Sequence, residues 1–119
     1  MAANPVAPKP TLTLESEKTP TETIVRCSGT INSESAGQLT STARNLMLET
    51  KVLVLDLTNV GYLDSSGLGA IVGLFVSAKR SGCKLRLINL SQRVKELFSL
   101  TRLAPLFEGH EDMLGMTPD

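Results

Sequence analysis

Apolar and polar positions alternate with two different periods along this chain, and the change of period predicts strands and helices in turn. Alternation of Thr and Leu over residues 11–15, followed by β-branched residues within 23–28, predicts a β-hairpin. Gly29 either ends the second strand or permits a bulge. A continuous apolar run within residues 51–57 predicts a third strand that is buried on both faces. Residues 84–90 predict a fourth strand.

Helical spacing fills the intervals between the later strands. An amphipathic helix is predicted to end near residue 48, with Asn32 and Ser33 as candidates for its N-cap. A second helix begins at Ser66 and Gly67 and ends at Gly82; its buried stripe is predicted to contain Leu68, Ile71, Val72, Phe75 and Val76. Ser91 is predicted to cap a third helix, with Val94, Leu97 and Phe98 on its buried face.

Strands that alternate with helices are typical of an α/β fold with right-handed crossovers. The order β-β-α-β-α-β-α predicts a single α/β domain, and a further short strand could form at residues 106–107. The opening hairpin makes the four- to five-stranded sheet mixed, while periodicity leaves open whether the helices cover one face or two. We expect the domain to span residues 11–108, between a flexible proline-rich tail at residues 1–10 and a mobile acidic end at residues 109–119.

The charge and composition exclude several classes of partner. The formal net charge is zero and the pI is near 6.6, so no overall field attracts nucleic acid or anionic lipid. No secretory signal opens the chain, and its longest apolar run, residues 67–76, is far shorter than the roughly 20 residues that span a bilayer. We expect a soluble, cytoplasmic protein without membrane insertion. Cys27 and Cys83 are expected to be buried free thiols, although the sequence leaves a bridge open.

Residues that carry enzymatic chemistry are scarce. His110 is the one histidine of the chain, so a Ser-His-acid hydrolase would have to recruit it. Asp64-Ser65-Ser66-Gly67 is not a Gly-x-Ser-x-Gly elbow, and the cysteines and His110 lack the spacing of metal ligands. The chain has no phosphate-binding glycine motif of either common type. We therefore expect no catalytic residues, no metal, no cofactor and no enzymatic activity.

The Asp64-Ser65-Ser66-Gly67 turn is the place where polar chemistry is concentrated. It follows a buried strand and opens a helix, where α/β sheets usually carry function. The positive end of the helix dipole would tolerate a phosphate on Ser65 or Ser66, while Asp64 would repel it. Position alone leaves two interpretations open: these side chains cap the helix, or one caps while the other projects as a modification site.

Glycines in the helix that follows the turn also allow two interpretations. An interior glycine costs about 1 kcal/mol relative to Ala, so each one requires a reason. One reason is tight packing of the helix against the sheet. The other is a smooth outer ridge that a partner approaches, with Leu74 as an exposed apolar contact. The second interpretation makes the partner-binding residues Gly69, Ala70, Gly73 and Leu74.

Three segments together resemble one family. Residues 54–69, which include Tyr62-Leu63-Asp64-Ser65-Ser66-Gly67-Leu68-Gly69, closely resemble the STAS domain of bacterial anti-sigma factor antagonists. Residues 28–32 are similar to the Gly-x-Leu/Ile-Asp turn of that family, with Asn32 in place of the commoner Asp. Residues 97–103 resemble the end of the family's third helix. The similarity covers about residues 12–108.

The resemblance implies a mechanism that the residues alone do not give. It implies helices mainly on one side of the sheet, and it makes Ser65 the phosphoacceptor, with Asp64, Ser66 and Gly67 forming the switch turn. The implied kinase is an anti-sigma factor with a histidine-kinase-like ATPase fold, which the unphosphorylated chain binds so that a sigma factor is released. Phosphorylation ends this binding, and a PP2C-type phosphatase reverses it.

Two other functions remain open from the sequence. The chain could be a STAS subunit of an ABC-type lipid-transport complex that binds its ATPase constitutively. It could also be a small hydrolase that uses Ser65, with His110 as its base. The complete Asp-Ser-Ser-Gly run favours the phosphorylation switch over the lipid-transport subunit, and the lack of a Gly-x-Ser-x-Gly elbow disfavours the hydrolase.

Overall fold

The computed structural model describes residues 10–100, and the side chains of residues 10–96. It contains the predicted order of elements, which is confirmed for this part of the chain. The elements are β1 (Leu12–Lys18), β2 (Thr23–Ile31), α1 (Ala36–Met47), β3 (Val52–Leu63), α2 (Ser65–Ser81), β4 (Lys84–Ile88) and α3 (Gln92–Leu100). The further strand expected at residues 106–107, most of the N-terminal tail and the acidic end lie outside the described residues.

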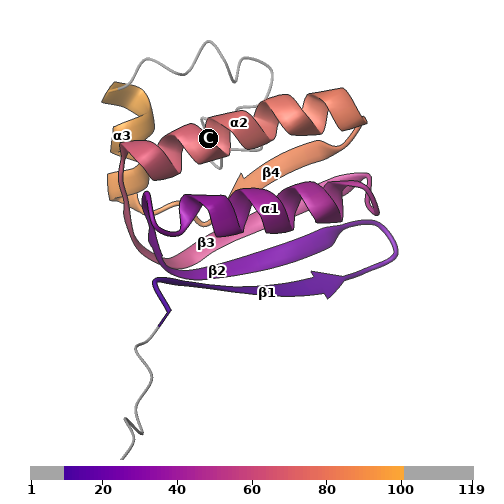
Figure 1. Ribbon diagram of the computed structural model, residues 1–119, viewed down its shortest axis with the longest axis horizontal. Coiled ribbons are helices and arrows are strands. Elements are labelled where there is room, and N and C mark those ends of the chain that lie inside the picture. Colours follow the sequence, from indigo (N-terminus) through magenta and orange to yellow (C-terminus); the bar gives the residue numbers. More distant parts are fainter. Residues whose placement is uncertain (1–9, 101–119) are drawn as a thin grey trace, which may run out of the picture.

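The four strands form one mixed sheet in the order β1-β2-β3-β4. β1 pairs antiparallel with β2, as a hairpin requires, whereas β2–β3 and β3–β4 are parallel. Helices α1 and α2 cover the same face of this sheet, and α3 lies beside the end at which β3 finishes and α2 begins (Figure 1). The arrangement therefore settles the question that periodicity left open, in favour of helices mainly on one side.

The core lies between the sheet and these two helices. Alternate residues of β3, Leu53, Leu55 and Leu57, belong to one apolar cluster with Leu39 of α1 and others from α2 and β4. Val54 lies between them in sequence and so projects from the opposite face of the sheet, where it is also buried. The prediction that the third strand is buried on both faces is confirmed at these positions.

Two strands extend further than the sequence pattern indicates. β2 passes through Gly29, whose φ of 118° lies in a region that side chains rarely adopt. The register between β2 and β3 shifts beside this glycine, so it marks an irregularity rather than an end. β3 continues beyond Leu57 because its polar residues still pair with β2, as far as the pair Ile31–Leu63. Both strands consequently finish at the same end of the sheet.

The first helix begins later than its predicted N-caps. Asn32 Oδ1 accepts hydrogen bonds from the backbone N–H groups of Glu34 (3.0 Å) and Ser35 (3.3 Å), which forms a turn ahead of the helix. Ser35 takes the N-cap position, yet its hydroxyl donates to the Thr30 carbonyl oxygen at 2.7 Å instead of capping. The assignment of Asn32 or Ser33 as N-cap was wrong, because their local turn competes with the helix.

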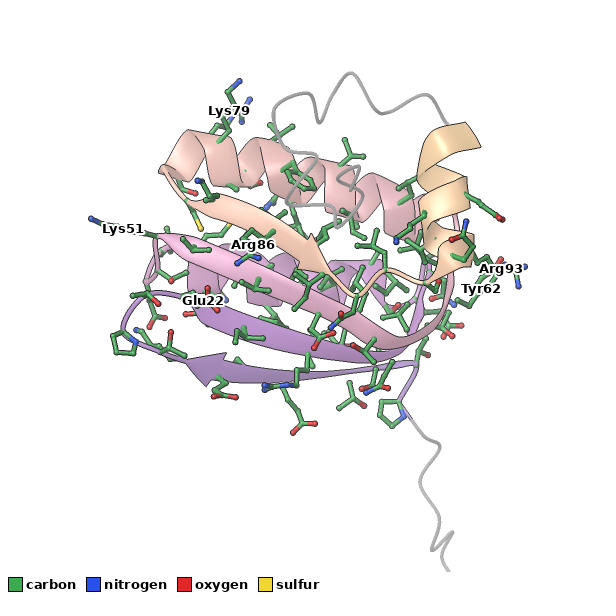
Figure 2. All side chains as sticks on the ribbon, turned by 180° about the vertical axis from the view of Figure 1, so that it is seen from behind. Glu22, Lys51, Tyr62, Lys79, Arg86 and Arg93 are labelled. Atoms are coloured by element: carbon green, nitrogen blue, oxygen red, sulfur yellow. The ribbon has the colours of Figure 1, made fainter. Side chains whose placement is uncertain are left out.

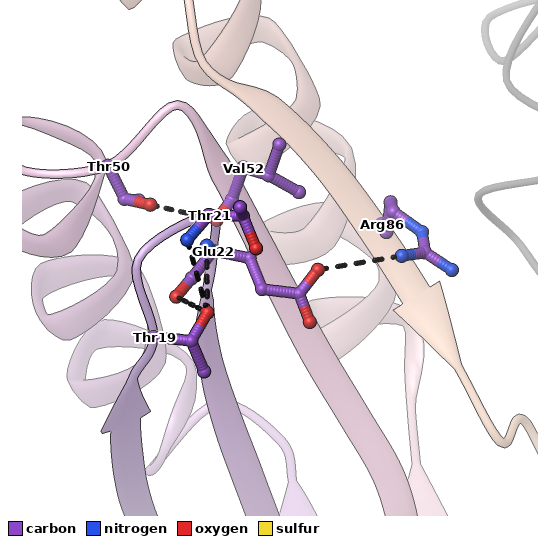
Figure 3. Close-up of polar contacts among 6 residues, drawn as sticks. All are labelled: Thr19, Thr21, Glu22, Thr50, Val52 and Arg86. Atoms are coloured by element: carbon purple, nitrogen blue, oxygen red, sulfur yellow. Dashed lines mark hydrogen bonds and ion pairs between the residues drawn. The ribbon is translucent and has the colours of Figure 1, made fainter.

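At the opposite end of the sheet, hydrogen bonds and an ion pair stabilise the loops that join the elements (Figure 3). The Thr19 hydroxyl donates to the Glu22 carbonyl oxygen at 3.0 Å and accepts from the N–H of Glu22 at 3.0 Å. The Glu22 carboxylate faces the Arg86 guanidinium at 3.8 Å, a partly exposed ion pair of small energetic value. Thr50 donates to the Val52 carbonyl oxygen at 3.0 Å. The contacts of these polar side chains therefore stabilise the local structure.

Candidate functional site

The candidate site is the turn that joins β3 to α2. Asp64 is the N-cap of α2, with its backbone extended, and its Oδ1 accepts a hydrogen bond from the Gly67 N–H at 3.0 Å. The capping interpretation is therefore confirmed for Asp64, whereas neither Ser65 nor Ser66 supplies the cap hydrogen bond. Both serines are exposed, and neither hydroxyl hydrogen-bonds to another group in the described part of the chain.

Gly67 fixes this turn against the end of β2. A Cβ at this position would lie 2.3 Å from the Ile31 carbonyl oxygen and 2.8 Å from the Ile31 side chain. The same carbonyl oxygen accepts a hydrogen bond from the Asp64 N–H at 3.2 Å. Only glycine permits this approach, so the start of α2 is held by a rigid backbone contact and Gly67 has a structural role.

The two serines border different grooves. Ser65 lines a groove of about 500 Å³ between the turn and α3, here called the α3 groove; it is lined by Gly61, Tyr62, Leu63, Asp64, Ser65, Ser91, Arg93, Val94 and Glu96. Ser66 lines a more open groove of about 560 Å³ between the two long helices, here called the α1–α2 groove; it is lined by Ala36, Gly37, Thr40, Ser41, Arg44, Asn45, Ser66 and Ala70. Adjacent hydroxyls thus face different surroundings.

Among the described residues that line the α3 groove, one side chain is a cation and two are carboxylates. The Arg93 guanidinium lies over the ring of Tyr62, 5.9 Å from its centroid (Figure 2). Arg93 makes no ion pair within the described residues, although Asp64 and Glu96 line the same groove. Sequence reasoning missed Arg93 and Tyr62. The available signal was topological, because β4 runs parallel to β3 and the segment after Ile88 therefore continues toward the end of β3.

A polar cluster behind the groove positions α3. Asn89 adopts a φ of 59°, and its Nδ2 donates to Asp56 Oδ1 at 3.0 Å, joining the loop after β4 to β3. Desolvation raises the pKa of Asp56, but hydrogen bonds from Thr58 and Asn89 and the charge of Arg26 together lower it below its usual value. The Ser91 hydroxyl then accepts from the Val94 N–H at 3.2 Å, which confirms the predicted cap.

The outer face of α2 differs from its prediction at two positions. Leu74, expected as an exposed partner contact, is 0% exposed, and Val76, expected in the buried stripe, is 49% exposed. α2 packs against α1 as well as against the sheet, so its buried arc is displaced toward α1 and takes in Leu74 and Ala78. The proposal of Leu74 as a contact residue is therefore wrong, and Val76 is the exposed apolar residue of this helix.

Two other glycines of α2 have no close neighbours among the described residues. Within this part of the chain, a Cβ at Gly69 or at Gly73 would meet no heavy atom within 4 Å. Tight packing inside the chain thus explains Gly67 but neither of these two. Gly69 is exposed, Gly73 is half-buried, and the neighbouring Ala70 lines the α1–α2 groove.

Other chemistry considered from the sequence has little support in the described residues. Cys27 and Cys83 are free and buried, and desolvation, with a smaller effect of Asp56, raises the pKa of the Cys27 thiol to about 12. Residues 10–96, whose side chains are described, contain no cluster of three side chains suited to a metal ion. Within the same residues, no helix is long and apolar enough to cross a membrane. His110 lies outside the described part.

Comparison with known proteins identifies the domain. The family model of the STAS domain matches residues 13–113. The anti-sigma-B factor antagonist of Listeria monocytogenes is 46% identical over 57 residues, which is 48% of this chain and 50% of that protein. The match thus spans about half the length of this curated relative.

Solved structures share the fold. Unphosphorylated SpoIIAA, an anti-sigma factor antagonist, has a TM-score of 0.66 at 17% identity, covering 89% of this chain and 100% of that one. The phosphorylated form of the Bacillus cell fate determinant SpoIIAA has a TM-score of 0.62 at 18% identity, covering 79% and 87%. The family model, the matching relative and the mixed sheet with its helices agree: the chain belongs to the STAS domain family.

Proposed function

We propose that this protein is an anti-sigma factor antagonist that binds an anti-sigma factor in its unphosphorylated form and is switched off by phosphorylation of Ser65. The observation that carries the proposal is the free, exposed Ser65 hydroxyl at the start of α2, where Asp64 has taken over the cap. The name of the Listeria relative and the two solved forms of SpoIIAA support it.

The proposed partner is an anti-sigma factor with a histidine-kinase-like ATPase fold, which also acts as the kinase. In the transfer step, Ser65 Oγ forms a bond to the γ-phosphorus of ATP and the bond to the β–γ bridging oxygen breaks. ADP leaves, and the hydroxyl proton passes to a base of the kinase. A PP2C-type phosphatase restores the serine by hydrolysis. All these steps belong to the cytoplasm, where sigma factors act.

The proposed binding surface is the outer side of α2 next to Ser65. It contains Gly69, Ala70 and Gly73, with Val76 in place of Leu74. Interior glycines weaken a helix, and the described residues leave open space at Gly69 and Gly73, so packing within residues 10–96 gives no reason for their presence. Close approach of a partner backbone would supply that reason.

The expected loss of binding affinity on phosphorylation follows from the charge of the phosphate. A phosphate adds about −1.5 to −2 charges at neutral pH. A charge left unpaired in an interface costs roughly 2–5 kcal/mol. Since about 1.4 kcal/mol corresponds to a factor of ten, binding weakens some thirtyfold to several thousandfold. The helix dipole tolerates the phosphate, so the chain need not unfold.

Phosphate mapping tests the assignment of the acceptor. The protein is incubated with the anti-sigma factor and ATP, and mass spectrometry counts and locates the phosphate. We expect one phosphate on the wild type and on Ser66→Ala, and none on Ser65→Ala. Continued incorporation in Ser65→Ala would refute the acceptor. Co-purification of an ABC-type ATPase in place of a sigma-regulating kinase would instead favour a lipid-transport subunit.

A further inference from the structure

The α3 groove contains a cation that the proposed function does not use. Arg93 is exposed in the first turn of α3, and the ring of Tyr62 lies 5.9 Å from its guanidinium carbon. Within the described residues it forms no ion pair, although Asp64 and Glu96 line the same groove. A planar guanidinium with five donors is the side chain best suited to bind phosphate.

Ser65 opens into this same groove, whereas Ser66 opens into the groove on the other side of α2. A phosphate on Ser65 would therefore share a groove with Arg93, whereas a phosphate on Ser66 would border a groove that Arg93 does not line. Tyr62, three positions before Ser65 at the end of β3, places its ring beneath the Arg93 guanidinium. The bond from Asn89 to Asp56 holds the loop that carries α3 in place.

We propose that Arg93 is an intramolecular receptor for the phosphate on Ser65, positioned by the ring of Tyr62. The inference rests on the proposed function, because it assumes that Ser65 carries the phosphate. Binding to Arg93 directs the phosphate into the α3 groove and joins α2 to α3 through an ion pair. The switch then alters the surface that α3 presents, in addition to the charge at the turn.

The second pKa of the phosphate reports this contact directly. Arg93 favours the dianion and lowers that pKa, whereas the carboxylates of Asp64 and Glu96 raise it. Tyr62 is the other titratable group that lines the groove. Phosphoserine is placed at position 65 during translation, so the measurement needs no kinase. The pKa is then read from the phosphorus-31 chemical shift across pH.

We expect Arg93→Gln to raise this pKa by about 0.5, since the groove is open to water and the charges are partly screened. Arg93→Lys should retain part of the effect, Tyr62→Leu should lose part of it, and Tyr62→Phe should retain all of it. The matched control is Arg80→Gln, which removes an equal charge from the last turn of α2. Circular dichroism verifies that each variant is folded.

An unchanged phosphate pKa in folded Arg93→Gln would overturn the proposal, as would an equal change in Arg80→Gln. The same substitution with phosphoserine at position 66 should leave the pKa unaltered, and an equal change there would also refute a contact specific to Ser65. Failure of the kinase to modify Ser65 is a separate result. It would refute the proposed function, while the phosphorus measurement decides the Arg93 contact.

Discussion

Ser65 and Ser66 are neighbours in sequence, but the grooves that they border differ in chemistry. The α3 groove of Ser65 contains Arg93, Tyr62, Asp64 and Glu96, and is rich in charge. The α1–α2 groove of Ser66 is lined mainly by small or uncharged side chains. A helix turns by about 100° per residue, so one step along α2 is enough to separate the two hydroxyls. A modifying enzyme would therefore meet different surroundings at Ser65 and at Ser66.

The glycines of α2 show a parallel difference. Gly67 contacts the end of β2 so closely that a methyl group has no space, whereas no described residue comes near a methyl group placed at Gly69 or Gly73. The first glycine builds the turn that both grooves share. The other two lie on the proposed binding surface. Substitution can separate these roles.

The largest expected effect is that of Gly67→Ala. The new Cβ would lie 2.3 Å from a backbone oxygen of Ile31, which cannot move without disturbing the sheet. We expect a loss of roughly 2–4 kcal/mol in the free energy of unfolding, measured by urea denaturation. A variant as stable as the wild type would show that the turn is not held by this contact.

Asp64→Ala should have a smaller effect, because it removes a single cap. We expect a loss of about 1 kcal/mol in the free energy of unfolding. Asp64→Asn retains an acceptor oxygen and should lose less. If urea denaturation ranks Asn below Ala, the hydrogen bond to Gly67 is not the main contribution of Asp64.

Gly69→Ala and Gly73→Ala should act in the opposite direction from Gly67→Ala. Each should raise the free energy of unfolding by up to about 1 kcal/mol, because alanine favours the helix and its methyl group meets no neighbour. At the same time each should weaken binding to the anti-sigma factor, measured by titration calorimetry. Gain of stability with unchanged affinity would remove these positions from the binding surface.

The smallest expected effect concerns Asp56, which accepts a hydrogen bond from Asn89 and so anchors the loop that leads to α3. Hydrogen bonds lower its folded pKa below the usual 3.8 despite desolvation, so its contribution to stability is present above that pH. The contribution is lost as pH falls through the folded pKa. Asp56→Asn keeps an acceptor without titrating, so the stability of the wild type should decrease more steeply with acid. Parallel pH profiles below about pH 4 would contradict this.

Much of the fold was predictable because its signals are local. The alternating periods predict the order of elements, and the polar turn after a buried strand indicates the site. The burial of Leu74 and the exposure of Val76 were not predictable from the apolar pattern of α2 alone, because the position of α1 decides which side of α2 is buried. The contact of Arg93 with Tyr62 joins residues far apart in sequence, and only the parallel pairing of β3 with β4 brings them together.

The affinity for the anti-sigma factor before and after phosphorylation of Ser65 tests the central claim most directly. The dissociation constant is measured by titration calorimetry for the unmodified chain and for the chain with phosphoserine at position 65. We predict that the phosphate weakens binding at least about thirtyfold. Equal dissociation constants for the two forms would contradict a switch at Ser65.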